Sequence, residues 1–92
     1  MTQKNIAEQI LELASEQRLE IIIHLSKQKT KLTEMAKLVD ATKPEIHRNF
    51  ERMKKSGIIQ KDNEGYYSLT TIGNALRSQI PLMEFISKNK TL

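Results

Sequence analysis

The chain has 92 residues and a formal net charge of +4, with 15 lysines and arginines against 11 aspartates and glutamates. It contains no cysteine, which excludes disulfides, thiol nucleophiles and thiolate metal sites. Its longest apolar run, three isoleucines at residues 21–23, is far shorter than the roughly 20 residues of a membrane span. We expect one cytoplasmic domain with one modest core, because the first residues also lack the apolar segment of a signal peptide.

The positive charge is concentrated in the middle of the chain. Residues 27–61 hold ten basic and four acidic residues, a balance of +6, whereas residues 1–26 have a balance of −2 and residues 62–92 are neutral. A localised excess of this kind is typical of a surface that meets a phosphate backbone. Taken alone, a run of lysines and arginines is more often a solvated helix face. The secondary-structure elements that carry the charge therefore decide between a solvated face and a surface that binds phosphates.

Two amphipathic helices are predicted before the basic segment. Apolar residues at helical spacing indicate the first, over residues 3–14. Ser15 is placed to cap the second, which runs to about residue 27. The three isoleucines favour a strand by propensity, but the residues around them do not alternate as a strand would, so we expect a helix.

A short helix and a sharp turn follow. We expect Thr33 to cap a helix over residues 34–39, with Met35 and Leu38 facing inward and Ala36 as a third candidate. Asp40 then stands where the chain must turn, and aspartate tolerates the left-handed conformation better than most residues.

The longer basic helix over residues 43–55 has the clearest local signals. Thr42 and Glu45 have the spacing of a capping box, and Pro44 lies in the first turn, where its missing N–H costs no hydrogen bond. Gly57 suits the cap that ends the helix. Its apolar residues form one narrow stripe by which it would dock, namely Ile46, Phe50 and Met53.

A β-hairpin and a final helix complete the pattern. Residues 58–60 and 66–69 flank a polar segment in which Gly65 supplies a positive backbone angle. Thr70 or Thr71 caps the last helix.

This order of elements resembles the winged helix-turn-helix domain of prokaryotic, and particularly archaeal, transcriptional regulators. The resemblance covers about residues 15–78 and is densest in MAKLVDATKPEIHRNFERMKKSGII, which looks like the family's turn, recognition helix and exit. It implies a mainly α fold with a small β-hairpin, in a single domain over residues 1–92 that binds double-stranded DNA with the hairpin at residues 58–69 as its wing. The acidic wing tip at residues 62–64 departs from the family and argues against strong insertion into the minor groove.

The helix over residues 43–55 keeps one face free when its apolar stripe is docked. Such a face can lie in the major groove, which is about 12 Å wide, and its first residues reach deepest. The residues expected nearest the base edges are Lys43, Pro44, His47 and Arg48. Those expected at phosphates are Thr33, Thr42, Arg52, Lys54, Lys55, Lys61 and Tyr66.

Some of these positions have a second interpretation. The capping box explains Glu45 without a contact to cytosine. His47 and Glu51 are four residues apart on one helix, a spacing that can bind a metal, but two ligands without cysteine are too few for the usual metal site. For Tyr66, packing within the hairpin and contact with a phosphate are expected equally. We expect neither a metal nor a cofactor, and the sequence indicates no effector.

The leading interpretation is a sequence-specific transcriptional regulator, or its DNA-binding domain. A winged-helix protein-interaction module would be expected to lose the basic face, and an architectural DNA-binding protein to carry a more uniform positive charge. An enzyme is not expected, because the sequence offers no paired carboxylates, no nucleophile with a base and no phosphate-binding glycine loop.

Apolar residues at the two ends of the chain predict a homodimer. The helices expected at residues 3–14 and 71–88 carry more apolar surface than one small core needs, and exposed patches of that kind usually mark an interface. Alternatively, they pack on their own domain or on a missing C-terminal region. The resemblance favours the dimer, since winged-helix regulators commonly dimerise through flanking helices. The candidate interface residues are Ile6, Ile10, Leu13, Leu82, Met83, Phe85 and Ile86.

Overall fold

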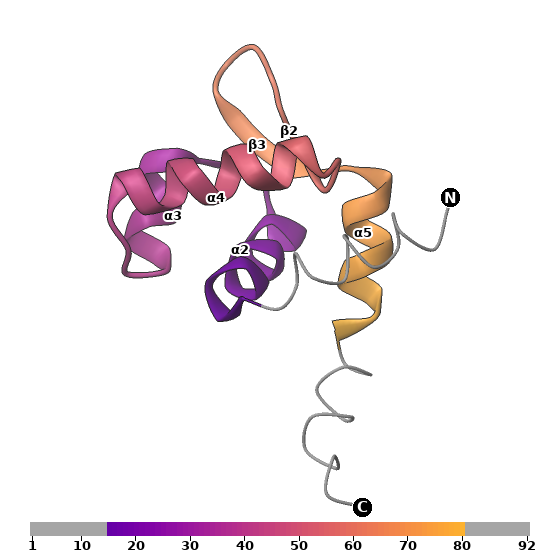
Figure 1. Ribbon diagram of the computed structural model, residues 1–92. Coiled ribbons are helices and arrows are strands. Elements are labelled where there is room, and N and C mark those ends of the chain that lie inside the picture. Colours follow the sequence, from indigo (N-terminus) through magenta and orange to yellow (C-terminus); the bar gives the residue numbers. More distant parts are fainter. Residues whose placement is uncertain (1–14, 81–92) are drawn as a thin grey trace, which may run out of the picture.

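The computed structural model describes residues 15–80 and places helices around a small sheet (Figure 1). The helices are α2 (Glu16–Lys27), α3 (Leu32–Leu38), α4 (Lys43–Lys55) and α5 (Thr71–Ser78). The strands are β1 (Thr30–Lys31), β2 (Ile59–Lys61) and β3 (Tyr66–Leu69). The helix predicted over residues 3–14 and the apolar residues after Pro81 lie outside the described residues.

The three strands form an antiparallel sheet in the order β1-β3-β2. The hairpin of β2 and β3 was predicted, but β1 was not. It pairs Thr30 with Tyr67 and Lys31 with Tyr66. Both Thr30 and Tyr67 are buried, so this face of the sheet lies against the core. A strand of two residues has no alternation that a sequence could display, and only its pairing with β3 defines it.

The isoleucine run is helical, as predicted. The Ser15 hydroxyl accepts a hydrogen bond from the amide of Arg18 (3.4 Å), which caps α2 at its first turn. Ile21 and Ile22 are fully buried and Leu25 nearly so. Their spacing of three and four residues points one side of α2 at the core, so burial of that side overrides the strand propensity of isoleucine.

The start and the inner face of α3 differ from the prediction. Thr33 does not cap the helix: α3 begins at Leu32, Lys31 stands at the N-cap position, and no side chain makes a cap hydrogen bond. The reason is β1, because its last residue leads directly into the helix. The prediction for Leu38 was also wrong, since its side chain is 53 % exposed. The inner face consists of the buried Met35 and Ala36, with Leu32 and the C-cap residue Val39 partly buried beside them.

The turn and the boundaries of α4 confirm the sequence signals. Asp40 has a φ of +52° and Gly57 a φ of +79°. The Thr42 hydroxyl accepts a hydrogen bond from the amide of Glu45 (3.2 Å), and the Glu45 carboxylate accepts one from the amide of Thr42 (3.3 Å), so the capping box is complete.

The apolar stripe of α4 lies at the centre of the core. Ile46, Phe50 and Met53 are fully buried. The rings of Phe50 and Tyr67 have their centroids 4.1 Å apart at an angle of 40°. This contact joins α4 to the central strand of the sheet and so fixes the helix relative to the hairpin.

α5 also lies against the sheet, and it approaches the chain before β2 very closely. A Cβ atom at Gly73 would lie 2.2 Å from the carbonyl oxygen of Ile58. The same carbonyl accepts hydrogen bonds from the amide and the hydroxyl of Thr70, both at 3.0 Å. Thr70, rather than Thr71, is the N-cap of α5. The glycine is therefore required by the distance between the backbones and not by a turn.

Candidate nucleic-acid interface

The side of α4 opposite its apolar stripe is open to solvent. Lys43, Pro44, His47 and Arg48, the residues expected nearest the base edges, are all exposed. Because the buried stripe holds the other side of the helix in the core, these four side chains are presented on a rigid element.

The residues expected at phosphates spread from this face over three further parts of the fold. Arg52, Lys54 and Lys55 border a shallow, open depression at the end of α4. Thr33 lies in α3, Thr42 caps α4, and Lys61 and Tyr66 belong to the hairpin. All are exposed except Lys54 and Tyr66, which are partly exposed.

Glu51 places a negative charge within the basic face. Its Oε1 atom lies 3.5 Å from Nζ of Lys54 and 3.9 Å from Nε2 of His47. Among the residues that the structure describes, no three histidines, aspartates or glutamates gather to hold a metal ion, so His47 and Glu51 have no third ligand.

The inner flank of α4 is tied to α2 by a polar contact that the sequence did not reveal. Arg18 Nη1 donates a hydrogen bond to Oδ1 of Asn49 (3.2 Å), and Nδ2 of Asn49 donates one to Oε1 of Gln17. A polar residue in the first turn of a helix is normally expected to face solvent. Because Arg18 and Asn49 are also about thirty residues apart along the chain, no local pattern predicts their contact. The contact helps to set the orientation of α4 relative to α2.

The loop of the hairpin is an ordered turn built around Asp62. Its Oδ1 atom accepts hydrogen bonds from the amides of Tyr66 and Glu64, both at 2.9 Å. These bonds, that from Tyr66 foremost, lower the pKa of the Asp62 carboxyl, and the nearby Lys29 ammonium acts in the same direction. The lowered pKa means that the carboxylate stays charged to a lower pH than an ordinary aspartate, and its hydrogen bonds help to hold the turn.

Lysines cover the two tyrosine rings of the central strand. Nζ of Lys29 lies 4.7 Å and Nζ of Lys31 lies 5.0 Å from the ring centroid of Tyr66. Nζ of Lys61 lies 5.7 Å from the ring centroid of Tyr67. Lys29 and Lys31 were not among the predicted contacts, because their position beside Tyr66 depends on the unpredicted strand β1.

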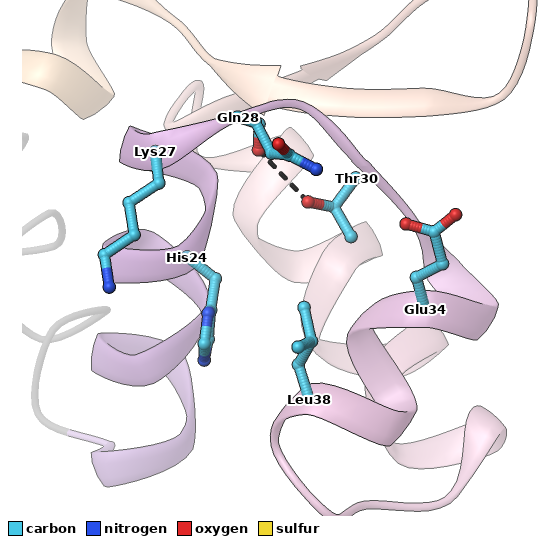
Figure 2. A pocket seen from close by; sticks show the side chains of 6 residues that line it. All are labelled: His24, Lys27, Gln28, Thr30, Glu34 and Leu38. Atoms are coloured by element: carbon cyan, nitrogen blue, oxygen red, sulfur yellow. Dashed lines mark hydrogen bonds between the residues drawn. The ribbon is translucent and has the colours of Figure 1, made fainter.

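A small hollow also lies between α2 and α3 (Figure 2). Its volume is about 230 Å³, below the roughly 300–1,000 Å³ of ordinary ligand pockets. The Thr30 hydroxyl at its edge donates to the carbonyl oxygen of Gln28 (3.1 Å), so this buried polar group is satisfied. The hollow is lined by His24, Lys27, Gln28, Thr30, Glu34 and Leu38.

A helix-turn-helix with an open second helix and an adjoining β-hairpin defines a winged helix-turn-helix domain, which confirms the predicted fold class. More particularly, the chain belongs to the HVO_A0114 family, whose profile matches residues 5–71. No curated protein matches its sequence. In the described part of the chain, no helix is long and apolar enough to cross a membrane.

Solved structures resemble this fold at low sequence identity. Reduced HlyU from Vibrio cholerae has a TM-score of 0.76 and 15% identity, over 90% of this chain and 88% of its own. The homodimeric winged helix-turn-helix DNA-binding domain of Mb0332 from Mycobacterium bovis, a possible ArsR-family regulator, has a TM-score of 0.78 and 18% identity, over 90% and 81%. The adhesin competence repressor AdcR from Streptococcus pyogenes has a TM-score of 0.66 and 19% identity, over 96% and 74%.

Proposed function

We propose that the protein is a sequence-specific transcriptional regulator that binds double-stranded DNA with α4 in the major groove and the hairpin as the wing. The observation that carries this proposal is that the two sides of α4 differ. The apolar stripe is buried, and the basic residues on the opposite side are accessible to solvent. These basic residues belong to the segment of charge +6. The DNA-binding domain of Mb0332 and the repressor AdcR, which have this fold, support the assignment.

The exposed face of α4 divides into a reading end and a holding end. The first two turns carry Arg48, whose guanidinium can donate two hydrogen bonds to guanine, and His47, which can donate to guanine or contact a thymine methyl. The last turn carries Lys54 and Lys55, which suit phosphates. At the start of the helix the amide of Thr42 already donates a hydrogen bond to the Glu45 carboxylate. Thr42 can therefore donate to a phosphate through its hydroxyl proton but not through its amide.

Two alanine substitutions test this division. Arg48→Ala should cost about 1–3 kcal/mol on the best site and relax the preference at one base pair, with little effect on random duplexes. Lys55→Ala should weaken binding to all duplexes alike and reduce the salt slope by about one unit. Both are measured by titration of labelled specific and random duplexes. Equal losses for Arg48→Ala on the two duplexes would show that the reading end is placed wrongly.

Selection of binding sites from random duplex DNA tests the function itself. We expect an enriched motif, because Arg48 and His47 make contacts that differ between base pairs. Strong binding without an enriched motif would identify an architectural DNA-binding protein, and the absence of duplex binding would reject the proposal.

We also propose that the protein acts as a homodimer, as the domain of Mb0332 does. The candidate interface residues lie outside the described residues, so the proposal depends on their apolar character in the sequence. Sedimentation at micromolar concentration should give a species of about twice the 10.6 kDa of one chain. The substitution Phe85→Glu should return it to the monomer, because a charge in an apolar interface is not solvated. A single monomeric species in both proteins would reject the dimer.

A further inference from the structure

We propose that Glu51 determines part of the base preference of α4. Its carboxylate accepts a hydrogen bond from the amino group of a cytosine in the major groove, and its charge disfavours duplexes that offer no such group there. The inference rests on the proposed function and deepens it, because it assigns the specificity to an acidic residue. Phosphates attract only the positive charges of this face, so an acid on it needs a role of its own.

Glu51 lies between the reading end and the holding end of α4. Residues three and four apart on a helix are neighbours on its surface, so Glu51 stands beside His47 and Arg48. Its Oε1 atom lies 3.9 Å from Nε2 of His47 and 3.5 Å from Nζ of Lys54. Along the helix axis Glu51 is about 4.5 Å beyond Arg48, compared with about 3.4 Å between successive bases of a strand. The two side chains would therefore meet neighbouring base pairs.

The Glu51 carboxylate has lone pairs that remain open to a donor. A hydrogen bond between an ammonium and a carboxylate normally measures about 2.7–2.9 Å, so both contacts of Oε1 are too long for one. Among residues 15–80 no other group donates a hydrogen bond to Glu51, and its side chain is 48 % exposed. The other acid of α4 differs, since the Glu45 carboxylate accepts a hydrogen bond from the amide of Thr42. The donor for Glu51 can thus come from a ligand.

The chemistry of the major groove limits which donor this is. Phosphate oxygens, the N7 and O6 atoms of guanine and the O4 atom of thymine are acceptors, and they repel a carboxylate. The donors are the amino groups of cytosine and adenine. In adenine the amino group stands beside the N7 acceptor of the same base, whereas in cytosine it stands beside a carbon atom. Cytosine therefore fits the carboxylate better.

The charge of Glu51 also acts against duplexes of the wrong sequence. A carboxylate that enters the groove loses water, and without a donor it is left without a hydrogen bond near the phosphates. A penalty on wrong partners raises specificity even when it lowers the affinity for DNA in general. A surface ion pair such as that of Glu51 with Lys54 contributes little to stability. A purely structural role of Glu51 would leave the base preference unchanged.

Binding-site selection with the full chain and its variants tests the contact. The wild-type motif should contain a cytosine next to the base pair whose preference Arg48→Ala relaxes. Glu51→Ala should lose the preference at that position alone. Glu51→Gln should shift it to adenine, because a glutamine amide can donate to N7 and accept from the amino group of that base. Glu51→Asp keeps the charge on a shorter side chain, so it should lose the preference as Glu51→Ala does.

Titrations of the selected duplex and a random duplex give the second measurement. Glu51→Ala should bind the random duplex about three- to tenfold more tightly, because a charge that phosphates repel is removed. On the selected duplex it should bind no more tightly than the wild type, so the ratio of the two affinities should fall about fivefold or more. Glu51→Asp should not gain affinity for the random duplex, since its charge remains.

Glu20→Ala is the matched control, since it removes an exposed carboxylate from α2 and leaves α4 intact. It should leave the motif and the affinity ratio unchanged, and circular dichroism should show every variant folded. An equal gain for Glu51→Ala on both duplexes, or a motif that Glu51→Ala leaves unchanged, would overturn the inference. An adenine at this position of the wild-type motif would overturn the choice of cytosine. In these cases the wild-type motif and the Arg48→Ala effect would still stand, whereas a wild-type protein without an enriched motif would overturn the proposed function as well.

Discussion

Binding to a DNA duplex should weaken about a thousandfold when the monovalent salt concentration rises from about 50 to about 200 mM. The physical reason is the release of condensed counterions, which salt opposes. If the segment of charge +6 neutralises about six phosphates per protomer, log affinity should fall with log salt at a slope of about −5. Fluorescence anisotropy of a labelled duplex over a salt series measures the slope directly.

The thermal unfolding of the free protein over the same salt series serves as the control, because it separates lost affinity from lost structure. The surface ion pairs of Glu51 and Lys29 are screened by salt and contribute little to stability, so the midpoint should change only slightly. A slope near zero with a folded protein would reject DNA as the partner.

Truncation of Phe50 should have the largest effect on the fold. Its ring is fully buried and packs on Tyr67, so Phe50→Ala should reduce the free energy of unfolding by about 3–5 kcal/mol. Because a domain of this size has a stability of only about 5–15 kcal/mol, the loss is a large part of the total, and the unfolded fraction should rise by a factor of hundreds or more. Urea titration followed by circular dichroism measures the loss.

Phe50→Leu and Lys55→Ala are the controls for this experiment. The leucine variant keeps most of the volume and should lose less than about 1.5 kcal/mol. The exposed Lys55 should contribute less than about 0.5 kcal/mol. A loss below 1 kcal/mol for Phe50→Ala, on the scale of about 3–5 kcal/mol expected for a buried phenylalanine, would contradict the position of this ring at the centre of the core.

The features that the sequence predicts correctly are those specified by neighbouring residues. Thr42 and Glu45 lie three positions apart and form both hydrogen bonds of the capping box. Gly57 and Asp40 adopt positive φ angles because local chain reversal requires them. The buried stripe of α4 follows from helical periodicity, and the exposure of Arg48 on the opposite side follows with it.

The features that the sequence does not predict depend on contacts between distant residues. β1 exists because Thr30 and Lys31 pair with a strand more than thirty residues later. That pairing moves the start of α3 to Leu32 and brings two lysines to Tyr66. Asn49 likewise finds Gln17 only after α2 and α4 have packed together. Neither periodicity nor capping chemistry contains this information.

Because β1 leads directly into α3, the affinity of the domain for DNA should depend on the shape of the duplex. Lys31 belongs to the strand and to the start of the helix, and no residue between them can act as a hinge. On a bound duplex, the separation between the groove that α4 enters and the strand that the wing touches is therefore set by the protein. Where this separation differs from that of relaxed B-form DNA, the duplex would bend or twist to meet it, and the energy of that deformation would depend on base-pair steps that no side chain touches. Flexible pyrimidine–purine steps should then be favoured between the two contacts.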